Sequence, residues 1–336
     1  MIMKKFIAII LSLVLALSMT ACGSSAPAET KAPEAAGAAT ELKVAIIQQL
    51  DHSSLDEIRE AIKAQLNTLA EPTNYTITIE EYNGQNDTSM LTQIATQVVA
   101  DEPDMIIPIA TLAAQYAVLA AEGTDIPIVY AAISDPEGAG LVGLPNVTGV
   151  SDALNTPFIL DMMLAAQPDV KTVGLLYSTS EINSEAPIAE AKEYLNGKGI
   201  AYIEKTGTTS GEITEAAASL VGRVEAVFTP TDNVVMAAEA SVAELLNAGG
   251  IAHYTGADSF VQSGAFTTCG VNYTELGTKS ADIAFDIMMG GEIGEFVVMD
   301  GGIITVNTDT AAAIGVDYEV FNTMANTVNA VTTIVD

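Results

Sequence analysis

The stretch LKVAIIQQLDHSSLDEI (residues 42–58) predicts a strand, a polar turn and the start of a helix. Its apolar run Val44–Ile47 is continuous, which is typical of a strand covered on both faces of a parallel sheet. Leu55 begins a series of apolar residues at helical spacing. Ser54 and Glu57 have the spacing of a capping box at the helix start. We therefore predict the first half of a βαβ unit here.

The same alternation of strand and helix continues along the chain in two copies. The first copy adds strands at Tyr75–Glu81, Met105–Ile109, Ile126–Ile133 and Val147–Val150, with helices from about Thr88 and over Leu112–Ala121. The second copy follows Pro157, with strands at Thr172–Tyr177, Ile200–Lys205, Ala226–Thr229 and Ile251–Thr255 and helices at Ser184–Asn196, Glu212–Leu220 and Val234–Asn247. Such alternation gives right-handed βαβ units and parallel sheets. We expect an α/β fold of two Rossmann-like lobes joined by a hinge.

After residue 264 the chain has more predicted strands and helices than the second lobe requires, so we expect it to cross back to the first lobe. This predicts one lobe from 41–151 and 265–290, and another from 152–264 and 291–336. Two such sheets leave a cleft lined by strand carboxyl ends and helix N-termini. Free N–H groups and the helix dipole favour a carboxylate or phosphate there.

The first forty residues predict export and a tether. Two lysines precede the apolar run Phe6–Leu17, which is shorter than the about 20 residues of a membrane span. Residues 19–25, MTACGSS, resemble a bacterial lipobox, which implies cleavage of a signal peptide (1–21) and acylation of Cys22. Residues 22–40 are rich in Ala, Gly, Ser, Pro and Glu and predict a flexible tether. We expect a protein lipid-anchored on the extracytoplasmic face of the cell membrane.

Composition argues against two functional classes. The 336 residues include 12 Lys and Arg against 43 Asp and Glu, a net charge of −31, so no nucleic-acid partner is expected. The chain has only two histidines, His52 and His253, and neither a G-x-S-x-G nor an H-E-x-x-H motif. After processing, Cys269 is the sole thiol, and its apolar surroundings predict a buried residue. We therefore expect no catalysis, no metal and no cofactor.

Polar residues gather where the predicted strands end. Helix caps account for about one polar residue per turn, yet these turns carry three or four, which indicates a ligand site. The candidate ligand-binding residues are Gln49, His52, Asn86, Thr111, Asp152, Ser180, Asn183, Thr231, Asp232, Asp258 and Tyr273.

Several stretches, in order along the chain, resemble the substrate-binding lipoproteins of the tryptophan/tyrosine-type ABC importer family. They are His52–Asp56, Tyr82–Asp87, Ile109–Thr111, Ser134–Val142, Asn146–Asp152, Lys171–Tyr177, Ser180–Ser184, Pro230–Asn233 and Gly270–Tyr273. The resemblance covers about residues 42 to 290; the family's usual proline after the histidine is Ser53 here. It implies a type I periplasmic-binding-protein fold, an aromatic amino acid as solute, and a permease and ATPase as partners.

An α-amino acid presents a carboxylate, an ammonium and a side chain. We expect the carboxylate at Thr111 and the N–H groups of the helix it begins, with Asn183 and Ser184 opposite. Burying the ammonium requires a carboxylate, for which Asp232 or Asp258 is preferred and Asp152 follows. The side-chain pocket is expected to use His52, Gln49, Asn86 and Tyr273. Closure would be a hinge motion of a monomer.

Two alternatives stay open. One is a ligand-sensing receptor domain, which would have the same fold and site. The other is a different solute: a branched-chain amino acid, a nucleoside or a sugar. Sugar clefts usually stack the ring on aromatic side chains, and the chain has no Trp.

Overall fold

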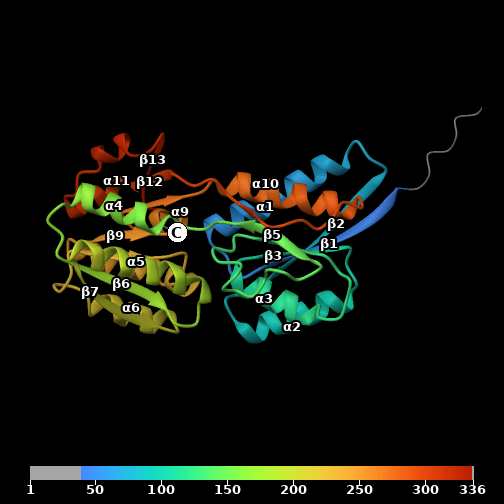
Figure 1. Ribbon diagram of the computed structural model, residues 1–336, viewed down its shortest axis with the longest axis horizontal. Coiled ribbons are helices and arrows are strands. Elements are labelled where there is room, and N and C mark those ends of the chain that lie inside the picture. Colours follow the sequence, from blue (N-terminus) through green and yellow to red (C-terminus); the bar gives the residue numbers. More distant parts are fainter. Residues whose placement is uncertain (1–38, 335–336) are drawn as a thin grey trace, which may run out of the picture. The chain divides into compact units, whose positions relative to one another are not determined.

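The computed structural model describes residues 39–334. The predicted signal peptide, Cys22 and residues 22–38 of the predicted tether lie outside the described residues. The described chain forms two α/β lobes, each built on its own sheet (Figure 1).

Lobe 1 contains a parallel sheet of six strands. Their order across the sheet is β11 (Val297–Val298), β5 (Val147–Ser151), β4 (Ile128–Ala131), β3 (Met105–Ile109), β1 (Thr40–Gln48) and β2 (Tyr75–Asn83). The helices of this lobe are α1 (Ser53–Ala70), α2 (Thr88–Ala100), α3 (Thr111–Ala120) and α10 (Tyr273–Met288).

Helices cover both faces of this sheet. Val44 and Ile46 of β1 pack in a core with α1 and α10, whereas Ala45 and Ile47 pack in another core with α2 and α3. Helices α1 and α10 also pack on each other, although more than 200 residues separate their starts (Figure 1). The two-faced burial predicted from the continuous apolar run is therefore confirmed.

Lobe 2 contains a sheet of seven strands, in which only the β10–β12 pair is antiparallel. The order is β13 (Thr327–Val331), β12 (Ile303–Asn307), β10 (Thr267–Gly270), β9 (Ala252–Thr255), β8 (Ala226–Thr229), β6 (Thr172–Ser178) and β7 (Ala201–Gly207). The helices are α4 (Thr156–Ala166), η1 (Ile182–Ser184), α5 (Glu185–Lys198), α6 (Ser210–Ala218), α7 (Asn233–Met236), α8 (Glu239–Ala248), α9 (Asp258–Gln262), α11 (Thr308–Ile314) and η2 (Glu319–Thr323).

The chain crosses between the lobes three times, after β5, after β10 and after β11. The chain returns to lobe 1 for α10, and the segments on either side of this helix divide differently from the expected boundaries. Strand β10 pairs with β9 in lobe 2, so 265–270 belongs to lobe 2. Strand β11 pairs with β5, so lobe 1 extends past residue 290. Short strands carry no signal that tells one parallel sheet from another, and only pairing assigns them.

The predicted capping box at α1 does not form. The helix begins at Ser53 after His52, which makes no side-chain cap bond. The Ser54 hydroxyl instead accepts a hydrogen bond from the backbone N–H of Ser259 in lobe 2 (3.1 Å). The Glu57 carboxylate accepts from the backbone N–H of Thr274 at the start of α10 (3.0 Å). Both residues therefore join distant segments, which local spacing does not reveal.

Candidate functional site

A cavity of about 30 Å³ lies between the lobes, at the carboxyl ends of strands from both sheets. It is lined by six of the predicted residues: His52, Thr111, Asp152, Asn183, Thr231 and Tyr273. The remaining lining residues are Ser54, Leu55, Ala110, Ala132, Ser134, Asn233, Ala257 and Phe260. The structure therefore brings both lobes to one site at the predicted edges of the sheets.

The N-terminus of α3 reaches the cavity through Ala110 and Thr111. Ala110 has a φ of 73°, in the left-handed region that alanine rarely adopts. Residues held in such conformations cluster at ligand clamps. Ala110 itself makes no side-chain cap bond, and among the first N–H groups of α3 that of Leu112 donates to the Gln49 side chain. The N–H groups of Thr111 and Ala113 and the helix dipole are left to interact with an anionic group.

Gln49 fixes this helix start from behind the cavity wall. Its Nε2 donates to Asn86 Oδ1 and to Glu181 Oε1, each at 2.9 Å. Its Oε1 accepts from the backbone N–H of Leu112 at 3.0 Å. Gln49 and Asn86 do not line the cavity, contrary to the prediction, because their amide groups are engaged in joining three segments.

Asp152 is the one acidic residue in the described cavity wall. Its Oδ1 accepts from the Ser134 hydroxyl (2.9 Å), and the Ser134 hydroxyl lies 2.7 Å from that of Thr231. Because the Ser134 hydrogen points to Asp152, Thr231 is the donor in the second bond, which joins the lobes. Burial raises the pKa of Asp152 to about 6. A buried carboxylate of this kind is stabilised by an ammonium partner.

Asp232 is not available for the predicted ammonium contact. One oxygen accepts from Ser178 N (2.6 Å) and from Ser184 Oγ (2.7 Å). The other accepts from the backbone N–H groups of Val234 and Val235 at 3.1 and 3.0 Å. Four donors therefore fill its lone pairs, and Asp232 caps α7 outside the cavity. In the sequence, a helix cap and a ligand contact have the same signal, and the contacts of Asp232 are those of a cap.

Two further predicted residues also lie outside the cavity wall. Ser180 exchanges a hydrogen bond with the Ser178 hydroxyl (2.7 Å). Asp258 starts α9, and its Oδ1 is buried without a partner among the described residues. Burial raises its pKa to about 6 as well. Asp258 therefore resembles Asp152 in having a raised pKa, but it is more exposed as a residue and lies outside the cavity wall.

His52 lies on the apolar side of the cavity, with Leu55 and Phe260. Burial lowers its pKa to about 4, so the imidazole is neutral at pH 7. Its Nδ1 is buried and has no hydrogen-bond partner in residues 39–334. Burial raises the pKa of Tyr273, opposite, well above its usual value. The site thus combines neutral aromatic side chains with one ionisable acid.

The sequence prediction missed Ser134, Glu181 and Asn233. Each lies in a polar turn that the sequence identified, and Glu181 and Asn233 are each next to a residue that was selected. The strand signal ends before these turns, so periodicity cannot tell which of their side chains point inward.

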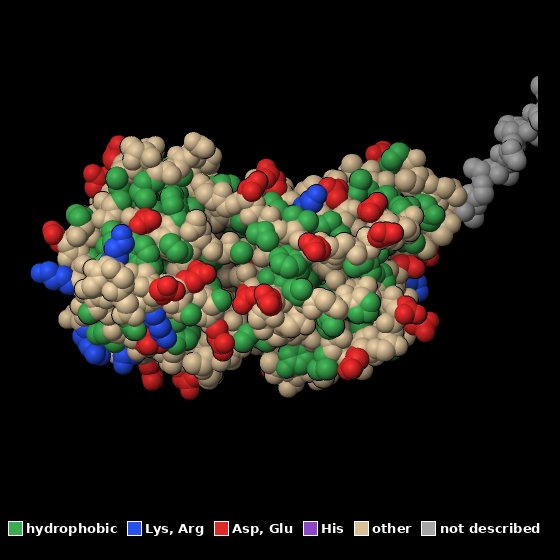
Figure 2. Space-filling model, viewed as in Figure 1, with side chains coloured by type: hydrophobic (Ala, Val, Ile, Leu, Met, Phe, Trp, Pro, Cys, Tyr) green, Lys and Arg blue, Asp and Glu red, His purple; other side chains and the backbone are tan. Residues whose placement is uncertain are grey.

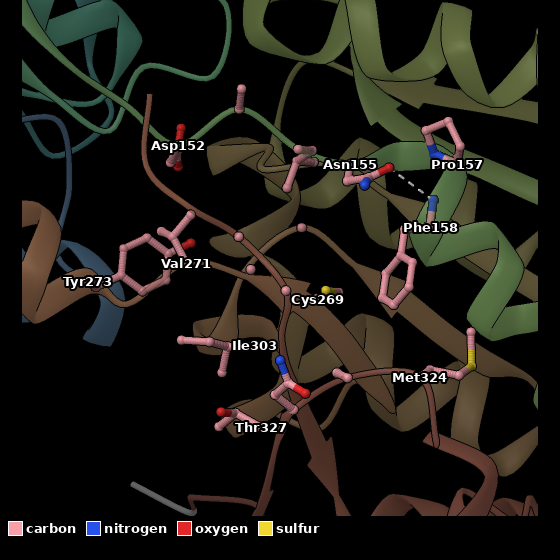
Figure 3. A pocket seen from close by; sticks show the side chains of 18 of the residues that line it. Asp152, Asn155, Pro157, Phe158, Cys269, Val271, Tyr273, Ile303, Met324 and Thr327 are labelled. Carbon is pink, nitrogen blue, oxygen red and sulfur yellow. Dashed lines mark hydrogen bonds between the residues drawn. The ribbon is translucent and has the colours of Figure 1, made fainter. Parts of the chain in front are cut away.

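A wide groove of about 890 Å³ lies on the hinge side of the molecule (Figure 3). It is lined by the hinge segments around Asp152, Val271 and Gly301, and by the loop that includes Met324. Asp152 and Tyr273 line both this groove and the cavity, so they form the wall between them. The Cys269 thiol lies in the groove wall but is buried, as predicted, and burial raises its pKa to about 11.

A carboxylate, an imidazole and a hydroxyl are also aligned in the core of lobe 2. His253 Nδ1 lies 3.0 Å from Glu239 Oε1, and its Nε2 lies 2.8 Å from Thr229 Oγ1. All three side chains are fully buried, and Thr229 donates to the Leu176 carbonyl. No substrate reaches this chain of hydrogen bonds, so it is a structural feature of the lobe core.

The described surface is strongly acidic, with Asp and Glu over both lobes and the few Lys and Arg mainly on lobe 2 of the face shown (Figure 2). Within residues 39–334, no group of three or more His, Cys, Asp or Glu side chains is placed to hold a metal ion. None of the helices described there has the length and apolar character needed to cross a bilayer.

Comparison with known proteins identifies the family. A family model described as ABC transporter substrate binding protein matches residues 43–326. A tyrosine-binding protein of Clostridioides difficile is 32% identical over 323 residues, which cover 93% of this chain and 92% of the relative.

Two solved structures are similar throughout. An ABC domain from Streptococcus pneumoniae in complex with L-Trp has a TM-score of 0.80 and 27% identity, covering 86% of this chain and 100% of that one. The ligand-free, open structure of a substrate-binding protein with adhesive properties from Clostridium difficile has a TM-score of 0.66 and 31% identity, covering 87% and 100%. The fold is that of type I periplasmic binding proteins, as the resemblance implied, and the chain belongs to the ABC transporter substrate-binding proteins, the extracytoplasmic solute-binding components of ABC importers.

Proposed function

We propose that this protein captures an aromatic L-amino acid, tyrosine or tryptophan, between its lobes and delivers it to an ABC permease and ATPase. The observation that carries the proposal is the pairing of one buried acid, Asp152, with the start of α3 at Thr111 in the wall of one cavity; in the first turn of α3 only the N–H of Leu112 donates to a described side chain, that of Gln49. A carboxylate and a helix N-terminus are the complements of the ammonium and carboxylate of an amino acid.

The remaining wall is suited to an aromatic side chain. Leu55, Phe260 and Ala257 supply apolar surface, and His52 and Tyr273 supply aromatic rings with polar edges. The relatives support this assignment, because one is named a tyrosine-binding protein and another was solved with L-Trp.

Binding requires the lobes to separate. The cavity of about 30 Å³ has room for about one water molecule, and pockets for small ligands usually measure about 300–1,000 Å³. The TM-score is 0.80 for the L-Trp complex and only 0.66 for the open, ligand-free relative, although the latter is more similar in sequence. These values support a closed arrangement that opens at the hinge to admit a solute.

A thermal-shift screen of the mature protein against the twenty amino acids, nucleosides and sugars tests the proposal. A solute at about 100 times its Kd adds about 2.7 kcal/mol, which for a chain of this size raises Tm by about 4 °C. Tyrosine or tryptophan should give the largest shift. A shift with only a sugar or nucleoside would reject the amino-acid assignment.

We also propose that the protein is a monomer held at the membrane by lipid on Cys22. Replacing this residue (Cys22→Ser) should move the protein from the membrane fraction to the medium or periplasm, because the sulfur carries the acyl anchor. Wild-type protein that stays in the aqueous phase of a detergent partition would contradict the anchor.

A further inference from the structure

Glu181 forms a direct contact between the two lobes. It precedes η1 in lobe 2 and is 1% exposed. Its Oε1 accepts from the Gln49 side chain of lobe 1 (2.9 Å), and its Oε2 accepts from Asn233 Nδ2 (3.1 Å). Opening the lobes must break the first of these bonds and expose the carboxyl group to water.

Among residues 39–334, no cation is placed to stabilise the charge on Glu181. Its two described donors are neutral amides, and the nearest ionisable group is the carboxyl of Asp232. Asp232 accepts four hydrogen bonds, which stabilise its own negative charge. Glu181 has only two, so of the pair it is the group that takes a proton.

Asn183 is a further amide close to the Glu181 carboxyl. As a donor, its amide group lowers the pKa of Glu181, against the larger opposing effects of burial and Asp232. Asn183 Nδ2 donates to the Thr231 carbonyl (2.6 Å), but its buried Oδ1 has no donor in the part of the chain that is described. A protonated Glu181 supplies an O–H donor in a region otherwise short of donors.

We propose that Glu181 is a proton-linked latch, so that the lobes close with uptake of one proton by its carboxyl group and thereby hold Gln49 and Asn233 in place. Glu181 lines no part of the cavity, so it acts as a positioning residue through these two amides. The latch concerns closure itself and does not depend on which solute is bound.

The direction of the pH effect follows from the two states. Burial and the neighbouring Asp232 raise the pKa of Glu181 to about 8 in the closed form, whereas an exposed Glu titrates near about 4.3. Closing is therefore favoured below pH 8 and weakens as pH rises toward 8. The closing constant should fall about tenfold per pH unit well below pH 8, and less steeply as pH approaches 8, where the closed form is half deprotonated.

Other ionisable groups at the cleft act at lower pH. The pKa of His52 is lowered to about 4 on closing, so protonation of this ring opposes closure below its usual value of about 6.5. The carboxyl groups of Asp152 and Asp258, with pKa values near 6, favour closure on protonation below that pH. The lobe 1 neighbours of Glu181, Gln49 and Asn86, carry no charge. The window from pH 6.5 to 8 therefore isolates Glu181.

Lobe separation can be followed in the ligand-free protein by single-molecule energy transfer between dyes on two exposed helix positions, Gln93→Cys in α2 and Ala218→Cys in α6. The ratio of closed to open molecules should fall about 16-fold in total from pH 6.5 to 8. Glu181→Gln is permanently neutral and should abolish this slope. Glu185→Gln, the same change at an exposed position four residues along, should keep it.

A wild-type ratio that does not change between pH 6.5 and 8 would overturn the latch, and so would a Glu181→Gln variant that keeps the wild-type slope. The wild-type measurement decides the matter even if the variant fails to fold. As a second readout, calorimetry with L-tyrosine is carried out at pH 7 in buffers of different ionisation enthalpy. Binding to the wild type should take up about one proton, and binding to Glu181→Gln should take up none. Failure of any amino acid to bind would reject the proposed function, while the dye measurement would still test the latch.

Discussion

Replacing Asp152 by asparagine removes the charge that we assign to the ligand ammonium and little else. The two side chains have nearly the same shape, and an asparagine oxygen can still accept the hydrogen bond from Ser134. Asp152 is 6% exposed, so the pair is only weakly screened by water. Two unit charges about 4 Å apart at an effective dielectric constant of about 20 attract by about 4 kcal/mol.

The amide dipole recovers part of this energy, so we expect a net loss of about 3 kcal/mol, or roughly 100-fold in Kd. Titration calorimetry with L-tyrosine and L-tryptophan at pH 7 measures it. Asp258→Asn is the matched control, because the pKa of this acid is also raised to about 6 but the residue lies outside the cavity wall. A Kd within threefold of wild type for Asp152→Asn, or a larger loss for Asp258→Asn, would refute the assignment.

Two further predictions concern selectivity and stability. His52→Leu should weaken tyrosine binding more than phenylalanine binding, because the buried Nδ1 of His52, which has no partner among the described residues, can bond the tyrosine hydroxyl. Equal losses of about 1–3 kcal/mol for both ligands in calorimetry would contradict this role. Gly149→Ala should lower Tm markedly, because its Cβ would collide with the backbone oxygen of Tyr130, whereas Gly197→Ala, in an open position on α5, should be neutral or stabilise by about 0.5 kcal/mol. Equal Tm values for the two glycine variants would contradict this prediction, because they would mean that β4 and β5 can move apart at Gly149 without loss of stability.

Most of the regular elements could be predicted from the sequence, because their signals are local. The apolar run of β1 and the N-cap at Asp87, whose side chain accepts from Met90 N, appear as expected. The helix expected over 234–247 is instead divided into α7 and α8. Helix α4, which has Pro157 in its first turn, was not predicted, because its apolar residues are not confined to one face of the helix.

The sequence indicated the turns around the candidate site but did not distinguish which of their residues line the cavity. The turns that end the strands were identified, and six of their residues line the cavity. The sequence could not rank Asp152 above Asp232, because both follow buried strands. The structure separates them: Asp232 accepts four hydrogen bonds from its own lobe, whereas Asp152 has Ser134 and faces the cavity.

The sequence by itself determined the class of fold, its division into two lobes and the edge at which a ligand would bind. These follow from periodicity and chain order, which depend on near neighbours. Only the tertiary structure decided which sheet receives β10 and β11, and that Glu181 of one lobe meets Gln49 of the other. The physical reason is that pairing and burial join residues far apart in the chain. The same carboxyl group is a surface charge, a cap or a latch according to what packs against it.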